Sequence, residues 1–149
     1  MASIDEEINS KLPNDKVRMM VNLMFTTNCI KNQFTDFLKP FDISSQQFNI
    51  LRILRGNGDW LAMNIVKERM IEKAPNATRL ADKMIAKGLI ERHRCDTDRR
   101  VVHVNITKEG LKLLQKIDEV DNEDRINYIE NVTEEEAKVM SDLLDKLRG

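Results

Sequence analysis

Apolar residues near the start of the chain recur at the spacing of a helix. Between residues 16 and 38 they fall mainly three or four positions apart, which predicts one long helix over that range. Pro40 cannot continue a helix and marks its end. The first 15 residues are polar and contain Pro13, so they predict either a loose arm or a short capping segment ahead of the helix.

Two more helices are predicted at the other end. Thr107 is placed to cap a long helix over about residues 108–131. Thr133-Glu134-Glu135-Glu136 has the spacing of a capping box and opens a last helix to about residue 147. The apolar faces of these terminal helices need cover, and the same helices of a second copy would provide it.

Three shorter helices are predicted in the middle of the chain. Ser44-Ser45-Gln46-Gln47 is another capping box, and the helix after it stops at Gly56-Asn57-Gly58. A short helix covers about residues 61–69. A third covers residues 75–87, because its proline suits the first helical position and Gly88 suits the position just after the last turn.

Two short strands follow, over residues 89–95 and 101–106, with a polar connection that predicts a hairpin tip. Helices followed by a two-stranded hairpin outline a winged helix–turn–helix. We therefore expect a mainly α fold with a small β-hairpin. Its winged helix–turn–helix core (41–110) would be flanked by an N-terminal arm and dimerisation helix (1–40) and by C-terminal dimerisation helices (111–149).

The helix predicted over residues 75–87 has two different faces. One face is apolar and fit to pack on the domain; it carries Ala77, Leu80, Ala81, Met84 and Ile85. The other face carries hydrogen-bond donors and cations; it consists of Asn76, Arg79, Lys83 and Lys87, with Thr78 beside them. Such side chains read base edges when a helix lies in a major groove. The same pattern also fits an ordinary amphipathic helix with a solvated face.

The hairpin tip carries Asp98-Arg99-Arg100. An arginine there can enter a narrow minor groove, and Asp98 can hold Arg100 by a charge-assisted hydrogen bond. The alternative is a solvated turn with a weak surface ion pair.

Charge is balanced over the whole chain but segregated along it. The 149 residues include 24 Lys and Arg and 25 Asp and Glu, for a net charge of −1. Residues 69–103 hold nine basic and five acidic side chains, whereas residues 117–149 hold four basic and eleven acidic ones. A local basic face can attract a polyanion despite the total, because salt screens charges beyond about 8–10 Å.

Composition and motifs exclude several classes of protein. Hydrophobic residues make up 41% and charged residues 33%, with five Gly and three Pro, which rules out collagen and low-complexity disorder. The acidic start lacks a secretory signal, and two cysteines are too few for a disulfide framework, so we expect a cytoplasmic protein. No catalytic triad order, H-E-x-x-H or glycine-rich phosphate loop is present, so we expect neither an enzyme nor a cofactor.

Three segments, in the right order, resemble the MarR family of transcription regulators. Residues 43–51 (ISSQQFNIL) are similar to the family's L-[ST]-x-x-Q-[aromatic]-x-[aliphatic]-L segment. Residues 77–80 (ATRL) and 86–92 (AKGLIER) resemble its V-T-R-L…KGLIER run. Residues 96–110, with D-x-D-R-R and a later T-x-x-G, resemble its wing. The flanking helices agree in length and position, so nearly the whole chain is covered.

The resemblance implies a homodimeric winged helix–turn–helix regulator, which we expect to repress transcription from a roughly palindromic site on double-stranded DNA. The terminal helices would form the dimer, and two reading helices would enter successive major grooves. The DNA-binding residues that it implies are Asn76, Thr78, Arg79, Lys83 and Lys87 on the reading helix, Asp98, Arg99 and Arg100 on the wing, and Ser44 and Ser45 at phosphate.

Two positions depart from the family pattern. Pro75 stands where the family often has Ser or Thr, which leaves a usual phosphate contact open. Ala77 replaces a bulkier residue, which could loosen the packing of the reading helix.

Many members of the family also bind small aromatic or anionic effectors between the dimer arms and the DNA-binding lobe. Met20, Met24, Phe25 and Phe48 are candidates to line such a pocket in this chain. A stripe of Met and aromatic residues at helical spacing is also typical of a core.

The remaining reactive side chains leave smaller alternatives open. Cys29 is interpreted as a buried structural residue, whereas Cys95, close to the hairpin tip, could respond to oxidation. His93, Cys95 and His103 could offer three ligands to zinc, but no fourth ligand is evident and we expect no metal. A winged helix that binds another protein rather than DNA remains the competing function.

Overall fold

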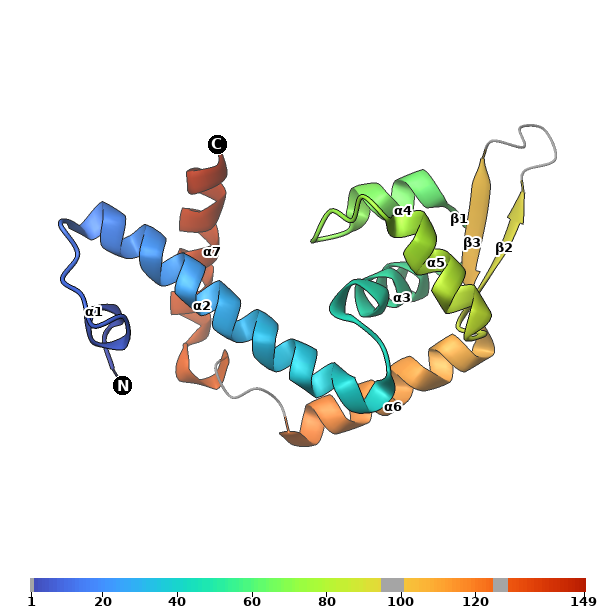
Figure 1. Cartoon of the computed structure of the whole chain (residues 1–149), viewed down its shortest axis with the longest axis horizontal. Coiled ribbons are helices and arrows are strands. Elements are labelled where there is room, and N and C mark those ends of the chain that lie inside the picture. Colours follow the sequence, from blue (N-terminus) through green and yellow to red (C-terminus); the bar gives the residue numbers. More distant parts are fainter. Residues whose placement is uncertain (1, 95–100, 125–128) are drawn as a thin grey trace.

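The computed structural model describes residues 2–94, 101–124 and 129–149 (Figure 1). Its longest element is α2 (Asp15–Leu38), which the sequence predicts to within one residue. The Asn14 side chain caps this helix by accepting from the Val17 backbone N–H at 3.0 Å. A short 3₁₀ turn, η1 (Lys39–Phe41), contains Pro40 and ends the helix as expected.

Of the two alternatives predicted for the first 15 residues, the loose arm is wrong. Residues 4–7 form a helical turn, α1 (Ile4–Glu7), because Ile4 is only 5% exposed and packs toward α2, and Asp5 pairs with Arg18 at 3.1 Å. The Ser3 backbone N–H donates to the Glu6 carboxylate at 2.6 Å, which lowers the pKa of that carboxyl below its usual range. A Ser-x-x-Glu cap was therefore present in the sequence and was missed.

A lobe of three helices and a small sheet follows the long helix (Figure 1). Its elements are α3 (Ser45–Asn57), β1 (Leu61–Ala62), α4 (Met63–Arg69), α5 (Ala77–Ala86), β2 (Ile90–Arg94) and β3 (Val102–Ile106). The predicted capping box at the start of α3 is confirmed in both directions. The Gln47 N–H donates to Ser44 Oγ at 3.1 Å, and the Ser44 N–H donates to Gln47 Oε1 at 3.0 Å.

The sheet has three antiparallel strands in the order β1-β3-β2, so the predicted hairpin is confirmed and one strand was missed. Leu61 and Ala62, predicted as helical, instead pair with Val104 and His103 of β3. Two residues are too few to show a strand period, and their partners lie about 40 positions along the chain. The helix α4 therefore begins only at Met63.

The helix α5 starts two residues later than predicted and ends as predicted. Asn76 has φ −102° and ψ 27°, which is not helical, so Pro75 lies outside the first turn. At the other end Gly88 has φ 70°, and the Leu89 N–H donates to the Met84 carbonyl at 3.0 Å. This is the Schellman geometry in which glycine is favoured.

Two helices complete the chain. Thr107 caps α6 (Lys108–Asp124) as predicted, since its hydroxyl accepts from the Gly110 N–H at 3.1 Å. The predicted extension to residue 131 is wrong: residues 129–131 form a 3₁₀ turn, η2 (Ile129–Asn131), because the next cap, Thr133, must be extended (ψ 163°). The last helix, α7 (Glu134–Arg148), has its predicted capping box.

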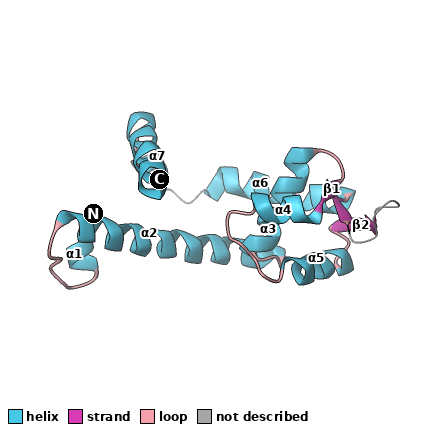
Figure 2. Cartoon of the chain, turned by 90° about the horizontal axis from the view of Figure 1, so that it is seen from above, coloured by secondary structure: helices cyan, strands magenta, loops and turns pink. Residues whose placement is uncertain are grey.

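One hydrophobic core lies in the lobe and reaches α6. Its fully buried members are Leu38, Ile50, Leu51, Leu54, Val66, Met84, Ile90, Val104, Leu114 and Ile117. By contrast, Leu38 is the only buried residue of α2, and α7 has none. Both helices project away from the lobe, and the view from above shows α7 standing clear of α2 (Figure 2).

Gly110 provides a test of how tightly the lobe is joined to α6. A Cβ at this position would overlap the Leu89 carbonyl oxygen and stand 2.7 Å from Ile106 Cγ1, so Gly110→Ala should destabilise the fold by about 1–3 kcal/mol in urea unfolding. The matched control is Gly56→Ala in α3, where a Cβ meets nothing within 4 Å and a neutral or stabilising effect is expected. Equal stability of the two variants would contradict the close approach.

Candidate nucleic-acid interface

The helix α5 lies on the lobe with its apolar face inward, as predicted. Ala77 and Met84 are fully buried, and Leu80 and Ala81 are at most 9% exposed, whereas Ile85 is only partly buried. Ala77, which stands where a bulkier residue is typical, is itself part of the core. This burial fixes which side of α5 faces solvent.

The solvent side of α5 carries the predicted donors. Asn76, Thr78, Arg79 and Lys83 are all exposed. Within the described ranges, neither Arg79 nor Lys83 forms an ion pair, so both cations are open to an external anion. Lys87 differs, because its ammonium donates to the Asp42 backbone oxygen and pairs with the Asp42 carboxylate at 2.8 Å. The structure thus gives Lys87 a partner at the turn before α3.

A groove of about 640 Å³ lies between the start of α3 and the end of α5. It is lined by Ser44 and Gln47 from the cap, by Lys83 and Lys87 from α5, and by Lys39. The N-terminus of a helix carries positive partial charge, which favours an anion. Asp42 also lines the groove and pairs with Lys87, and Lys39 pairs with Asp36, so among the described residues Lys83 is the lysine of this groove without an ion pair. Ser44 is exposed and Ser45 is partly buried. The sequence reasoning missed Lys39, whose only signal was its place just before Pro40.

The predicted wing residues Asp98, Arg99 and Arg100, and also Cys95, lie outside the described residues. The two strands that lead to them are described. They pair in register from Ile90 with Ile106 to Arg94 with Val102.

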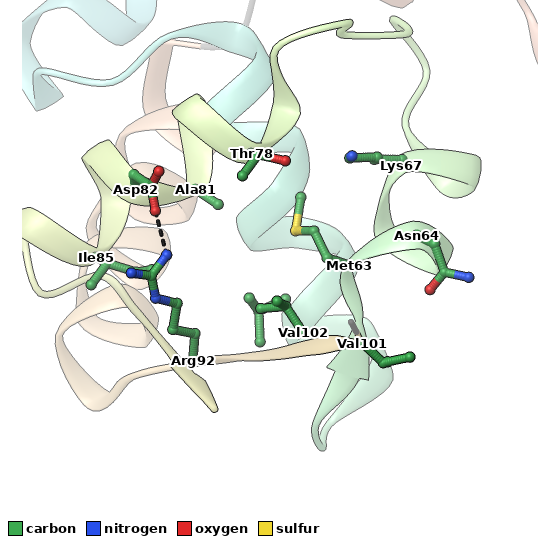
Figure 3. Close-up of a pocket in the computed structure, with 11 residues that line it drawn as sticks. Met63, Asn64, Lys67, Thr78, Ala81, Asp82, Ile85, Arg92, Val101 and Val102 are labelled. Carbon is green, nitrogen blue, oxygen red and sulfur yellow. Dashed lines mark hydrogen bonds and ion pairs between the residues drawn. The ribbon is translucent and has the colours of Figure 1, made fainter. Parts of the chain in front are cut away.

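A second groove, of about 380 Å³, lies between α4, α5 and the sheet (Figure 3). Lys67 of α4 and Thr78 of α5 point toward it from two sides. Arg92 of β2 also borders it and pairs with Asp82 of α5 at 2.5 Å, which joins the sheet to the helix. Arg92 was not among the predicted site residues, although it closes the AKGLIER segment in the sequence.

The two histidines lie opposite each other across the sheet. The His93 and His103 rings stack with centroids 5.3 Å apart and an angle of 14°, and Trp60 lies edge-on to His93 at 4.2 Å. The in-plane lone pairs of two nearly parallel stacked rings do not converge on one ion. Among the described residues, no three His, Cys, Asp or Glu side chains are grouped as metal ligands.

The four candidate pocket residues are not gathered within one chain. Met20 and Met24 are 42% and 63% exposed on α2, and Phe25 is 36% exposed. Phe48 instead packs edge-on against Phe34 at 5.2 Å between ring centroids, about 14 Å further along α2 than Phe25. Cys29 is only partly buried, contrary to the prediction, because the middle of α2 is not covered by other described residues of the chain.

None of the helices in the described ranges is long and apolar enough to cross a membrane.

Comparison with known proteins shows which family this chain resembles. The model of the MarR family matches residues 41–101. The HTH-type transcriptional regulator FarR of Neisseria gonorrhoeae is 30% identical over 129 residues, which cover 85% of this chain and 86% of that protein. The Multiple antibiotic resistance protein MarR of Salmonella typhimurium is 26% identical over 149 residues and covers 99% of both chains.

Solved structures share the fold. A mutant MarR from E. coli complexed with operator DNA has a TM-score of 0.78 and 23% identity, and the match covers 93% of this chain and 99% of that one. A MarR transcription factor from Planctomyces limnophilus has a TM-score of 0.67 and 32% identity, with 76% and 82% covered.

The cap of α3 can be separated from any role of Ser44 at an anion. Ser44→Ala removes the acceptor of the Gln47 N–H and should cost about 0.5–2 kcal/mol of unfolding free energy. Ser45→Ala, one position along and not the cap, should change stability by less than about 0.5 kcal/mol. Thermal and urea unfolding of both variants measure the difference, and equal losses would argue against the cap.

Proposed function

Since the chain belongs to the MarR family of transcriptional regulators, we propose that it binds double-stranded DNA sequence-specifically as a homodimer and represses transcription from a roughly palindromic operator. The observation that supports this proposal is the orientation of α5. Its apolar face is buried in the lobe while Arg79 and Lys83 stand exposed on the other side. A helix held in this way presents its polar stripe to a major groove. The site of action would be the cytoplasm.

The neighbouring cations support the same face as the contact surface. Ser44, Lys39 and the end of α5 surround one groove, and the cap of α3 adds positive partial charge there. Contacts of this kind hold phosphate and position a protein on the duplex, whereas Asn76, Thr78 and Arg79 would reach base edges. Asp98, Arg99 and Arg100 would extend the contact to the minor groove. A structurally similar protein, a mutant MarR from E. coli, has been solved complexed with operator DNA.

The terminal helices are proposed to form the dimer. Their exposed apolar residues are Val17, Met19, Met20, Met24, Phe25 and Ile30 on α2, and Val139, Met140, Leu143 and Leu147 on α7. Two helices with so many exposed apolar residues are unusual in a monomer, and a second copy is the partner that the chain itself supplies. The chain then divides into arms (1–40 and 111–149) and a DNA-binding lobe (41–110).

A small aromatic or anionic effector is part of the proposal. The exposed Met20, Met24 and Phe25 would become enclosed once a second copy covers α2. Their side chains are apolar and adaptable, which suits a small aromatic molecule. Binding between arms and lobe would release the operator by favouring a different lobe orientation.

The DNA proposal is tested first with Arg79. We expect the wild-type protein to select duplexes with an inverted repeat from a random pool. Arg79→Ala should lose about 1–3 kcal/mol of affinity for the selected operator and relax the preference at one position. Arg148→Ala on α7 removes the same charge from another helix and should leave affinity unchanged.

The same titration at several salt concentrations separates the two functions. Affinity for DNA should fall by about 0.9 log unit per log unit of salt for each phosphate contacted. A protein that retained no duplex even in dilute buffer would instead be a protein-interaction module.

The dimer is tested on α7. Leu143 is 59% exposed in the single chain, so Leu143→Glu would place a charge in the proposed interface and should yield a monomer with little operator affinity. Lys138→Glu changes the charge at a position that pairs only with Asp142 on the same helix and should leave the dimer intact. Sedimentation velocity distinguishes the species. An unchanged dimer for Leu143→Glu would place the interface elsewhere.

A further inference from the structure

One carboxylate of α6 is held by two arginines of α3. Arg52 Nη1 donates to Asp118 Oδ1 at 3.0 Å, and Arg55 Nη1 donates to Asp118 Oδ2 at 2.6 Å. The two arginines lie three positions apart, so they project from the same face of α3. All three side chains are between 31% and 41% exposed, so water screens them only in part. We call this set the Asp118 fork.

The fork also reaches α2 through an aromatic contact. The Arg52 guanidinium lies 5.4 Å from the centre of the Phe48 ring, in the range of a cation–π interaction. Phe48 in turn packs edge-on against Phe34 of α2. Two neighbouring side chains of α3 therefore link the lobe to the arms, Arg52 to α6 and Phe48 to α2.

The reading helix also packs on α3. α3 packs against α5, and Leu51 and Leu54 of α3 are fully buried in the same core as Met84 of α5. Any rotation of α3 relative to α2 and α6 therefore carries α5 with it. In the proposed dimer, α2 and α6 lead into the arms, so such a rotation changes the separation of the two reading helices.

A polar fork fixes the orientation of α3 relative to α6 better than apolar packing alone. Apolar contacts are non-directional and tolerate sliding. A carboxylate with each oxygen held by a separate guanidinium has a defined orientation, because charge-assisted hydrogen bonds require near-linear geometry. We propose that Arg52, Arg55 and Asp118 are positioning residues that fix the angle between lobe and arms, and thereby set the half-site spacing that the dimer accepts. This inference rests on the proposed function.

The first experiment measures the spacing preference directly. The wild type, Asp118→Asn and Glu109→Gln are titrated with the selected operator and with derivatives in which the half-sites are moved by one or two base pairs. Glu109→Gln is the matched control, because it removes a carboxylate of α6 whose ion pair, among the described residues, is with Lys112 on the same helix.

For Asp118→Asn we expect the ratio between the best and the altered spacings to fall about fivefold or more, the lower end of typical coupling between sites. The control should keep the wild-type profile. A uniform loss at all spacings, or no change, would overturn the proposal, since lost stability alone lowers every affinity alike.

Variants of Arg55 test the same proposal if Asp118→Asn folds poorly. Arg55→Lys retains the charge of the fork and should keep most of the spacing preference, whereas Arg55→Gln should flatten the profile. Once Asp118 is replaced, changing Arg55 should have no further effect on the spacing profile, because the two side chains act as one set. Independent, additive effects would show that they do not.

A second readout needs no DNA. Spin labels at Glu91→Cys, on the exposed side of β2, report the lobe-to-lobe distance in the full-length dimer after Cys29 and Cys95 are replaced by serine. The distance distribution should be narrow for the parent and broad for Asp118→Asn. An unchanged width would reject the positioning role. If no duplex is bound yet the width still changes, DNA binding fails and the positioning role stands, so the two failures are distinguishable.

Discussion

Every feature of the proposed interface depends on the burial of one face of α5. A short helix is marginal by itself in water, and α5 has only ten residues. Leu80 and Met84 each contribute about 1.5–3 kcal/mol by leaving water, and they can do so only in one orientation of the helix. That orientation turns Arg79 and Lys83 outward. The chemistry of the exposed stripe is thus a consequence of apolar packing on the other side.

The base of the hairpin secures this arrangement at a second point. Gly88 ends α5 in a left-handed conformation, and the Thr107 hydroxyl donates to its carbonyl at 2.6 Å while capping α6. Gly110 lets the first turn of α6 approach the backbone of Leu89. The end of α5, the start of β2 and the start of α6 are therefore joined within a few residues. Movement of any one of them is passed to the others.

Structural features that depend on residues three or four positions apart could be predicted from the sequence. The caps at Ser44, Thr107 and Thr133, and the two faces of α5, needed no knowledge of the rest of the fold. Contacts between distant segments were not readable, because nothing local marks them. The pairing of Leu61 with Val104, the partner of Lys87 at Asp42 and the Asp118 fork all belong to this group. The Ser3 cap was readable and was overlooked, since Pro13 and the polar residues favoured a loop.

The packing of Trp60 against His93 has a practical consequence. Trp60 is the only tryptophan in the chain, and its ring lies edge-on to His93 of β2 rather than on the arms. The tryptophan emission of the unmodified protein therefore comes from one known place beside the hairpin strands. Tryptophan fluorescence therefore reports conformational changes at that end of the molecule. It does not report changes among the arm helices, because they contain no tryptophan.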